Sequence, residues 1–419
     1  SARWLPTWNV SGAWNAHEEK FFSNLTSVLS HFTLKASYSL TADRGPADVT
    51  NSQAIITSYS PYRPFTSIQE SGLYIKELEN SELTYEKKHE LNIGADMGFL
   101  NNRINLAVDW YKRNNYDLIG IVNTQGAGGQ ILKYANIASM KSHGIEFTLS
   151  TKNIKTKDFN WNTDFIFSNA KNEVTDLKQN ANVMELISGN GFAKQGYPVR
   201  GLFSIPFVGL DKDGIPVIIN EKGEATSTDI NFQERQNTGF LKYEGPTDPT
   251  ITGSLGNMFS YKGFRLNLFI TYSFGNVIRL NPVFKAYYSD LTAMTREFKN
   301  RWTLPGDEAK TNVPAILSKR MYDSNEDLKY AYNAYNYSTE RIAKGDFIRL
   351  KEISLAYDFP KAWINPLKLT DLSLKVQATN LFLIYADDKL NGQDPEFFNA
   401  GGVASPVPRQ FTITLRLGL

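Results

Sequence analysis

The sequence predicts an all-β fold, an antiparallel transmembrane β-barrel, and three observations lead to that prediction. Segments in which apolar and polar residues alternate recur along the whole chain, as expected for strands with one apolar face. There are about eleven of them, most roughly 9–11 residues long, which is a membrane-crossing length and exceeds that of ordinary strands. After the first link, the connections are alternately short and long, an asymmetry typical of outer-membrane barrels.

The expected strands follow one another along the chain. They are 7–14, 32–40, 89–99, 103–111, 143–151, 160–169, 251–260, 265–274, 351–359, 372–380 and 411–419. The last of them sets Phe411, Ile413 and Leu415 on one face against Thr412 and Arg416 on the other. This period of two predicts a strand with one side in an apolar environment and the other in a polar one.

The links between the strands fall into two kinds. Two short ones are tight hairpins, at 100–102 and at 261–263. The long ones are 41–88, 115–142, 171–249, 275–346 and 382–409. In an outer-membrane barrel, short turns face the periplasm and long loops face the outside of the cell. A soluble sandwich with insertions is the alternative, but several loops longer than about 12–15 residues on one side would be unusual in a compact domain.

The residues on the apolar faces also favour the barrel. These faces carry no charge, and a Lys or Arg at mid-bilayer would cost about 2–4 kcal/mol. Aromatic side chains cluster near strand ends, as in interfacial girdles, for example Trp110 with Tyr111. An odd number of strands does not close a bacterial single-chain barrel, and an unpaired edge is not viable in lipid. We therefore expect residues 1–419 to be the C-terminal portion of a larger barrel.

Composition excludes several classes of protein and site. The 419 residues include 45 Lys and Arg against 43 Asp and Glu, so the net charge of +2 gives no electrostatic argument for a nucleic-acid partner. Cysteine is absent, which excludes disulfides and thiolate metal sites. The four histidines show no metal-ligand spacing. No apolar run approaches 18 residues, so no transmembrane helix is expected.

Eight stretches, in this order, carry a resemblance to a known family. They are WNVSGAWNAHEEKFF, YEKKHELNIGADMGFLNNRINLAVDWYKRNNYDLI, NIASMKSHGIEFTLSTKN, PTDPTITGSLGNMFSYKGFRLNLFITYSFGN, RWTLPGDEAK, GDFIRLKEISLAYDFP, LKVQATNLFLI and PRQFTITLRLGL. With them the chain resembles the C-terminal barrel of the SusC/RagA-type TonB-dependent outer-membrane transporters.

That resemblance implies a barrel of about 22 strands filled by an N-terminal plug, energised by TonB and covered by a SusD-like surface lipoprotein. It implies import of oligosaccharides or peptides across the outer membrane of a Gram-negative cell, without a cofactor. The plug, the TonB box and the first half of the barrel are family features missing from 1–419. The expected partners are therefore the remainder of the barrel with its plug, the SusD-like lipoprotein, TonB and outer-membrane lipid. A dimer of transporter–lipoprotein pairs is also compatible with the resemblance.

Two other functions stay open. A passive porin would use the same strands without plug, lid or energy. Arg265, Glu352, Lys375 and Arg416 lie on polar faces and would then line water in its lumen, whereas in the resembled family they would touch the plug. A surface glycan-binding β protein would stay soluble without detergent, which a barrel would not.

No arrangement of residues predicts an enzyme or a metal site. Nothing in the sequence marks a nucleophile and a base that would lie within hydrogen-bond reach. The stretch DKDG at 211–214 resembles the start of a calcium loop, but Lys222 stands where such a loop needs Glu. The surrounding FVGLDKDGIPVII instead predicts a β-hairpin with Asp213 and Gly214 in its turn. The acidic loop 386–397 is predicted to be a solvated turn.

Substrate contacts are predicted in 275–346, which is dense in Tyr, Arg and Asn. Exposed aromatic side chains beside amides suit sugar stacking and peptide contact alike. The candidates are Tyr287, Tyr288, Trp302, Tyr335 and Tyr337. The alternative is that these side chains pack the loop itself or the interface with the lid.

Overall fold

The computed structural model describes most of the chain. The described residues are 5–45, 54–62, 70–77, 79–80, 82–123, 126, 132–283, 294–398 and 408–418. Apart from Leu419, all residues of the strands that the sequence predicts lie within this part.

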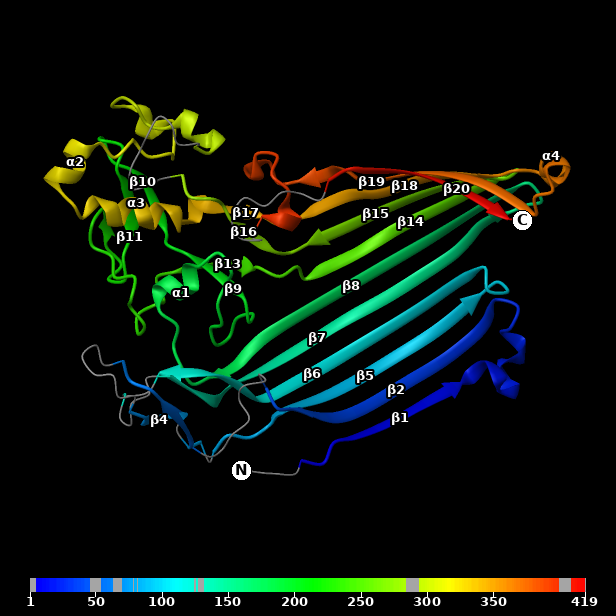
Figure 1. Cartoon of the computed structure of the whole chain (residues 1–419), viewed down its shortest axis with the longest axis horizontal. Coiled ribbons are helices and arrows are strands. Elements are labelled where there is room, and N and C mark those ends of the chain that lie inside the picture. The colour runs from blue at the N-terminus through cyan, green and yellow to red at the C-terminus, as the bar shows by residue number, and fades with distance from the viewer. Residues whose placement is uncertain are drawn as a thin grey trace.

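A single eleven-stranded antiparallel sheet dominates the fold (Figure 1). Its strands lie in the sheet in sequence order, and each pairs with the next. They are β1 (Trp8–Asn15), β2 (Leu29–Asp43), β5 (Glu86–Phe99), β6 (Ile104–Asn123), β7 (Leu132–Lys155), β8 (Phe159–Leu177), β14 (Ile251–Tyr261), β15 (Phe264–Phe274), β18 (Phe347–Asp358), β19 (Asp371–Ala386) and β20 (Gln410–Gly418). The predicted strand count and order are confirmed.

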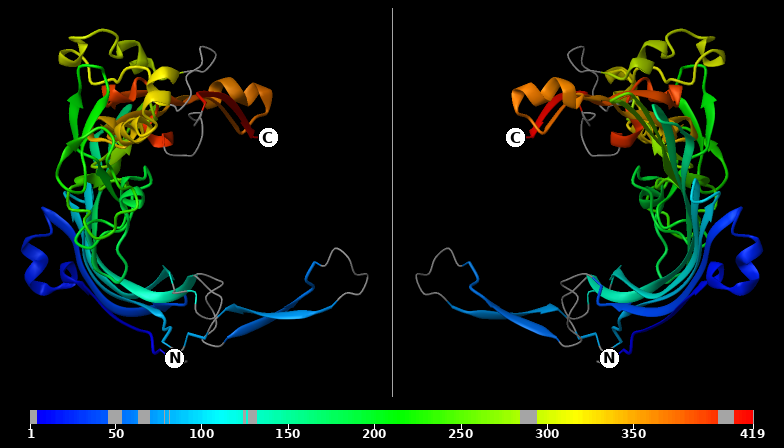
Figure 2. Two further views of the ribbon diagram at one scale, coloured as in Figure 1. Left: turned by 90° about the vertical axis from the view of Figure 1, so that its left-hand side faces the viewer. Right: turned by 90° about the vertical axis from the view of Figure 1, so that its right-hand side faces the viewer.

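The sheet curves strongly and stays open. Seen along its strands it has the outline of a trough, with the two edge strands far apart across the opening (Figure 2). The edges are β1 and β20, which do not pair with each other. The barrel is therefore only partly present in this chain.

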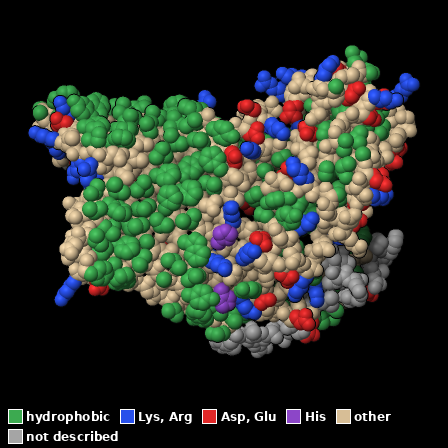
Figure 3. Space-filling view, turned by 180° about the vertical axis from the view of Figure 1, so that it is seen from behind, with side chains coloured by type: hydrophobic (Ala, Val, Ile, Leu, Met, Phe, Trp, Pro, Cys, Tyr) green, Lys and Arg blue, Asp and Glu red, His purple; other side chains and the backbone are tan. Residues whose placement is uncertain are grey.

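The two faces of the sheet differ in chemistry. Cross-strand pairing puts Ile93, Trp110 and Ile145 in one row on one face, because paired residues of neighbouring strands share a side. That face is the convex one, which carries a broad apolar area towards one end (Figure 3). The opposite, concave face holds polar side chains such as Asn92 and Asp109.

The short links all lie at one end of the sheet, here called the turn end. The link between β5 and β6 has Leu100, Asn101 and Asn102 at φ values of 51°, 56° and 58°, a left-handed path that turns the chain sharply. Lys262 and Gly263 make the similar turn between β14 and β15. Short helices form two further links at this end. The link between β1 and β2 contains η1 (Ala16–Glu18) and η2 (Lys20–Asn24), and the link between β18 and β19 contains α4 (Lys361–Ile364) and η6 (Asn365–Leu367).

One predicted loop is wrong. Most of 115–142 is strand, since β6 continues to Asn123 and β7 begins at Leu132, and β8 likewise reaches Leu177. In these extensions apolar residues stand next to each other in the sequence, as in Leu118 with Ile119 and Ile121 with Val122, so a period of two is not kept. Alternation therefore disappears from the sequence there, although the hydrogen-bonded ladder continues.

At the other end, three connections fold together into a unit that we call the cap: 178–250, the described part of 275–346, and 387–398 (Figure 1). It contains α1 (Val183–Ile187), β9 (Gly201–Ser204), β10 (Phe207–Leu210), β11 (Pro216–Ile219), β12 (Ala225–Thr226), β13 (Lys242–Pro246), β16 (Val277–Arg279), η3 (Arg296–Asn300), η4 (Asp307–Ala309), α2 (Lys319–Ser324), α3 (Leu328–Asn336), η5 (Thr339–Arg341), β17 (Ile342–Lys344), η7 (Asp388–Leu390) and η8 (Pro395–Phe397). A separate hairpin of β3 (Ile55–Tyr59) and β4 (Gly72–Glu77) lies in the connection after β2. Among the described helices, none has the length and apolar character needed to cross a membrane.

The hydrophobic core of the described chain lies largely in the cap. One buried cluster joins Leu186 and Phe203 of the first connection to Ala334 of the second. Another joins Ile278 of the second connection to Leu390 of the third. The three connections therefore share buried side chains and form one packed body rather than separate loops.

Candidate functional site

Arg279 joins two of the cap's connections. It lies at the end of β16 with 7% of its surface exposed. Its guanidinium donates to the carbonyl oxygens of Ser338 at 2.8 Å and Phe203 at 2.6 Å, and it lies 5.9 Å from the ring centroid of Tyr337. Burial lowers the pKa of Arg279 to about 9, and the charge of Glu244 offsets part of that effect. The residue therefore stays protonated at neutral pH and acts as a fixed donor inside the cap.

The third connection is held to the sheet by a buried ion pair. Arg349 of β18 pairs in register with Thr271 of β15, on the polar face of the sheet. Its Nη2 atom lies 2.5 and 2.6 Å from the two carboxylate oxygens of Asp394, and 3.3 Å from a carboxylate oxygen of Glu396. The segment 387–398 is therefore fixed over the concave face at the cap end of the sheet.

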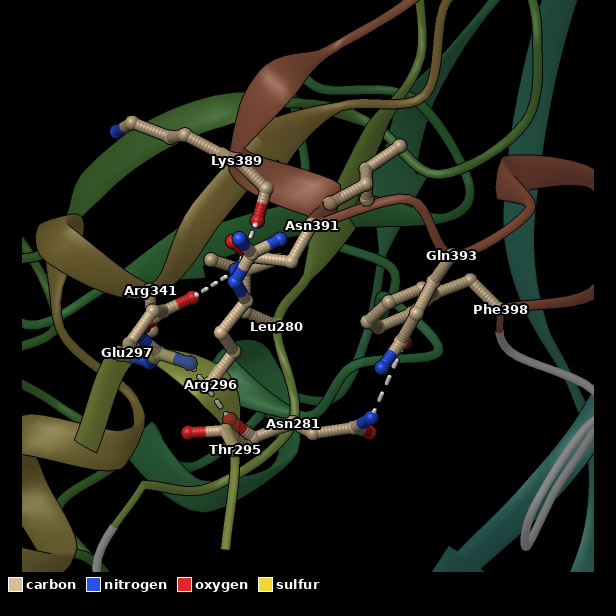
Figure 4. A pocket seen from close by; sticks show the side chains of 11 residues that line it. Leu280, Asn281, Thr295, Arg296, Glu297, Arg341, Lys389, Asn391, Gln393 and Phe398 are labelled. Carbon is tan, nitrogen blue, oxygen red and sulfur yellow. Dashed lines mark hydrogen bonds and ion pairs between the residues drawn. The ribbon is translucent and has the colours of Figure 1, made fainter. Parts of the chain in front are cut away.

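A small pocket opens where the second and third connections meet (Figure 4). Its lining residues are Leu280, Asn281, Thr295, Arg296, Glu297, Arg341, Lys389, Leu390, Asn391, Gln393 and Phe398. Arg341 pairs with the Glu297 carboxylate and donates to the Asn281 carbonyl at 2.7 Å. Asn391 donates to the same carboxylate at 2.9 Å, so the wall of the pocket is rich in amides and has one ion pair.

The pocket suits a small polar group. It encloses about 100 Å³, well below the volume of about 300–1,000 Å³ that takes a whole drug-sized ligand. Two of its buried polar atoms, the Thr295 hydroxyl and the Arg341 Nε, have no hydrogen-bond partner among the described residues. Buried polar groups are usually paired, so these two atoms favour a polar guest such as a sugar hydroxyl or a peptide group.

The structure places Tyr335 and Tyr337 together at the end of α3. Tyr335 is 2% exposed and packs edge-on against Phe207, with ring centroids 5.4 Å apart. Tyr337 packs against the cap's largest buried cluster. Both side chains thus take part in packing the cap, as the alternative explanation expected, and their contact with a substrate stays a prediction.

The structure does not place the other three candidate substrate-contacting residues beside Tyr335 and Tyr337. Trp302 lies against the turn at Gly214 and donates from its indole nitrogen to Glu308 at 2.9 Å. Tyr287 and Tyr288 lie outside the described residues. The predicted site residues are therefore not brought into one cluster within the described part of the chain.

The hairpin prediction for the DKDG stretch is confirmed. β10 pairs with β11 around a turn in which Gly214 has a φ of +75° and Asp211 accepts from the backbone of Asp213 and Ile215 at 2.9 Å each. The Asp211 carboxylate thus stabilises a turn. No group of three or more His, Asp or Glu residues in the described segments is arranged to hold a metal ion.

The concave face has a second, larger hollow near β1. It measures about 430 Å³ and is lined by residues of β1, β2, β5 and β6, most of them small or polar. At Gly94, a Cβ atom would lie 2.3 Å from the Asp109 carboxylate, so glycine here makes room for that carboxylate on the wall. Lys35 pairs with Asp96 at 2.8 Å beside it. This hollow can receive a polar segment lying inside the trough.

Ion pairs continue along the concave wall. Glu90 pairs with Arg113 at 3.1 Å and with Lys88 at 2.9 Å. Lys375 lies 3.9 Å from Glu352, two of the residues predicted to face the lumen. The charges of these pairs are therefore balanced locally, which keeps this part of the wall polar without a strong field of one sign.

Sequence reasoning missed the pocket and the Arg349–Asp394 pair, because their members are far apart in the chain. Sequence reasoning also missed that Leu328–Asn336 form a helix, α3, although the sequence contains a signal for it. Leu328, Ala331, Tyr332 and Tyr335 are all buried, and their spacing of three and four residues is that of one helix face. Helical periodicity could therefore have assigned Tyr335 to the core.

The chain is similar to curated proteins over nearly its whole length. No protein-family model matches it. TonB-dependent receptor P3 of Formosa agariphila is 25% identical over 404 residues, which cover 92% of this chain and 37% of that protein. TonB-dependent receptor SusC of Bacteroides thetaiotaomicron is 26% identical over 444 residues, which cover 100% of this chain and 40% of that protein. The chain thus spans less than half the length of these relatives.

A solved structure shares the fold. The RagAB peptide transporter aligns with a TM-score of 0.75 at 24% identity, over 98% of this chain and 43% of that chain. The alternation, the open eleven-stranded sheet and these similarities agree with the resemblance seen in the sequence motifs. The chain is similar in sequence to TonB-dependent receptors, SusC among them, and it has the fold of part of the β-barrel of the RagAB transporter.

Proposed function

We propose that residues 1–419 are the C-terminal portion of the barrel of a TonB-dependent outer-membrane transporter that imports oligosaccharides or peptides with a SusD-like lipoprotein. The observation that carries the proposal is the open trough itself, apolar on its convex face and polar on its concave face. Such a sheet suits a wall between lipid and a polar interior.

The edges of the trough support a larger barrel. On the outermost strand β20, Phe411 is 72% and Ile413 75% exposed, and Val10 of β1 is 69% exposed. Unpaired backbone groups at such edges are not viable in lipid, so further strands of the same protein would pair with both. The relatives have more than twice this length, which leaves room for those strands and for a plug domain.

A plug would account for the polar hollow on the concave wall. The hollow beside Asp109 and Lys35 faces the interior of the trough, where a plug domain would lie. The names of the relatives support import driven by TonB, and the RagAB structure is that of a peptide transporter. A passive porin would leave this wall in contact with water.

The cap supports a role in holding substrate. It is a packed body, and its pocket presents amides and an Arg–Glu pair beside two buried polar atoms without described partners. Amide and charged side chains can hydrogen-bond to sugar hydroxyls and to peptide groups alike, so both substrate classes remain in the proposal.

Uptake by the full-length protein tests the proposal. A host strain lacking the gene would be complemented with it and supplied with fluorescent oligosaccharides and fluorescent peptides, with and without TonB. We expect uptake of one class, lost without TonB, and co-purification of a surface lipoprotein in detergent. The full-length protein reconstituted in a bilayer should be closed. A steady open pore, or uptake that persists without TonB, would instead identify a passive porin.

A further inference from the structure

Three basic residues form a row across the convex face of the sheet. Lys112 of β6 pairs in register with His143 of β7, and His143 pairs with Lys171 of β8. All three are exposed. We call these three residues the basic row. Because directly paired residues share a face, their side chains project from the same side of the sheet.

The basic row marks where the apolar area ends. One row nearer the turn end, the same face carries Trp110 and Ile145, which are 37% and 38% exposed. One row nearer the cap, it carries Lys141 and Glu173, which pair with each other at 3.0 Å. Figure 3 shows Lys or Arg and His side chains gathered at this border of the apolar area. The row thus lies at the level at which lipid headgroups would meet a wall of this kind.

The two lysines of the row are available for a ligand. Neither Lys112 nor Lys171 forms an ion pair with another described residue, whereas Lys141 next to them does. They are two strand spacings apart, about 10 Å, with His143 between them. Long lysine side chains can bridge that distance, so both ammonium groups and one imidazole N–H can reach a single anion.

We propose that the basic row binds a phosphate group of a phosphorylated glycolipid in the outer leaflet of the membrane. Basic clusters at headgroup level bind anionic lipid headgroups, and here the cluster continues directly into an apolar surface that would contact the acyl chains. Trp110 lies at that junction, as aromatic residues do at membrane interfaces. This inference rests on the proposed function, because the row meets lipid only if the convex face does.

Binding of lipid A by the full-length, detergent-purified protein tests the inference. Bisphosphorylated lipid A and its dephosphorylated form would be titrated in micelles against the wild type and against a Lys112→Gln/Lys171→Gln variant. Each lysine near an anionic surface contributes on the order of fivefold in affinity, so the double variant should bind the phosphorylated form about 25-fold more weakly. A Lys155→Gln/Lys157→Gln variant is the matched control, since these exposed lysines lie at the turn end of the same wall.

The outcomes separate the two proposals. Equal affinity of the wild type and the double variant, or equal binding of both lipid A forms, would overturn the glycolipid site while the protein remains a detergent-extracted barrel. The basic row could instead bind an acidic protein. If the double variant loses such a co-purifying protein while its affinity for lipid A is unchanged, the glycolipid site is also overturned. Failure of the proposed function would show differently, as a steady open pore, as uptake that persists without TonB, or as a wild type that stays soluble without detergent.

Discussion

Arg349 of β18 and Asp394 of the last connection form a buried ion pair, with Nη2 at 2.5 and 2.6 Å from the two carboxylate oxygens. Their side chains are only 5% and 9% exposed. They are 45 residues apart in sequence, so the pair fixes a connection to the barrel wall that local structure alone would leave free. The Arg349–Asp394 pair thereby sets how far the segment 387–398 extends over the interior of the trough.

Breaking this pair should release the third connection. Arg349→Gln leaves the Asp394 carboxylate buried without a charge partner, and removing one member of a buried pair costs about 3–5 kcal/mol. Undocking of 387–398 relieves that cost. We therefore expect faster hydrogen exchange in this segment of the full-length protein, measured by mass spectrometry in detergent.

The matched control for that experiment is Arg265→Gln. Arg265 pairs with Asp358 at 2.9 Å, but both side chains are about half exposed, at 51% and 50%. Exposed pairs contribute only about 0–1 kcal/mol, so this variant should leave exchange in 387–398 unchanged. Equal exchange in both variants would mean that the pair does not hold the segment.

Two glycines on one strand should respond differently to alanine. At Gly253 of β14, a Cβ atom would lie 2.1 Å from the Ile166 carbonyl oxygen and 2.3 Å from the Tyr272 hydroxyl. Because the nearer atom is backbone, the wall must shift, which costs roughly 1–3 kcal/mol. Gly253→Ala should therefore lower the temperature at which the folded barrel loses its fast migration in SDS gels.

Gly256, three residues further along β14, is the control. The nearest atom to a Cβ there lies 3.7 Å away, an ordinary contact. Gly256→Ala should keep the wild-type transition temperature. A similar loss in both variants would point to a general intolerance of side chains in β14 and would contradict the crowding at Gly253.

The strands of this wall could be predicted from the sequence because lipid imposes a pattern on them. Ile93, Trp110 and Ile145 alternate with polar neighbours where one face meets an apolar medium. Where β6 and β7 continue past the apolar area, apolar residues such as Leu118 and Ile119 follow each other directly in the sequence, although the backbone ladder continues. Those extensions leave no periodic signal.

The cap could not be predicted, for a different reason. Its core combines short apolar runs from three distant connections, with Phe203, Ala334 and Leu390 as examples. Each run is too short to fix an element, and only their packing against one another makes them a core. The tyrosines of α3 illustrate the consequence, since density of aromatic residues suggested a binding surface where Tyr335 is buried.

The turn at Gly214 should be sensitive to a side chain because of Trp302. Its φ of +75° disfavours any other residue, and a Cβ atom would also lie 2.6 Å from the Trp302 ring. We expect Gly214→Ala to displace the indole and to make the cap more sensitive to limited proteolysis. Gly223→Ala, at a φ of +81° with no atom within 4 Å, carries the same backbone strain without the clash. Equal proteolysis of the two variants would show that the strain, and not Trp302, decides the effect.

Thr295 offers the sharpest test of the cap pocket. Its buried hydroxyl has no hydrogen-bond partner among the described residues, so Thr295→Val removes an unpaired polar group of nearly the same shape. Stability should stay the same or rise slightly, because an unsatisfied buried group is costly. If the hydroxyl binds substrate, uptake by the full-length protein should show an affinity about 2–10-fold lower, the equivalent of one hydrogen bond of roughly 0.5–1.5 kcal/mol. Thr175→Val on the exposed part of β8 is the control, and unchanged uptake in both variants would separate this pocket from the path of the substrate.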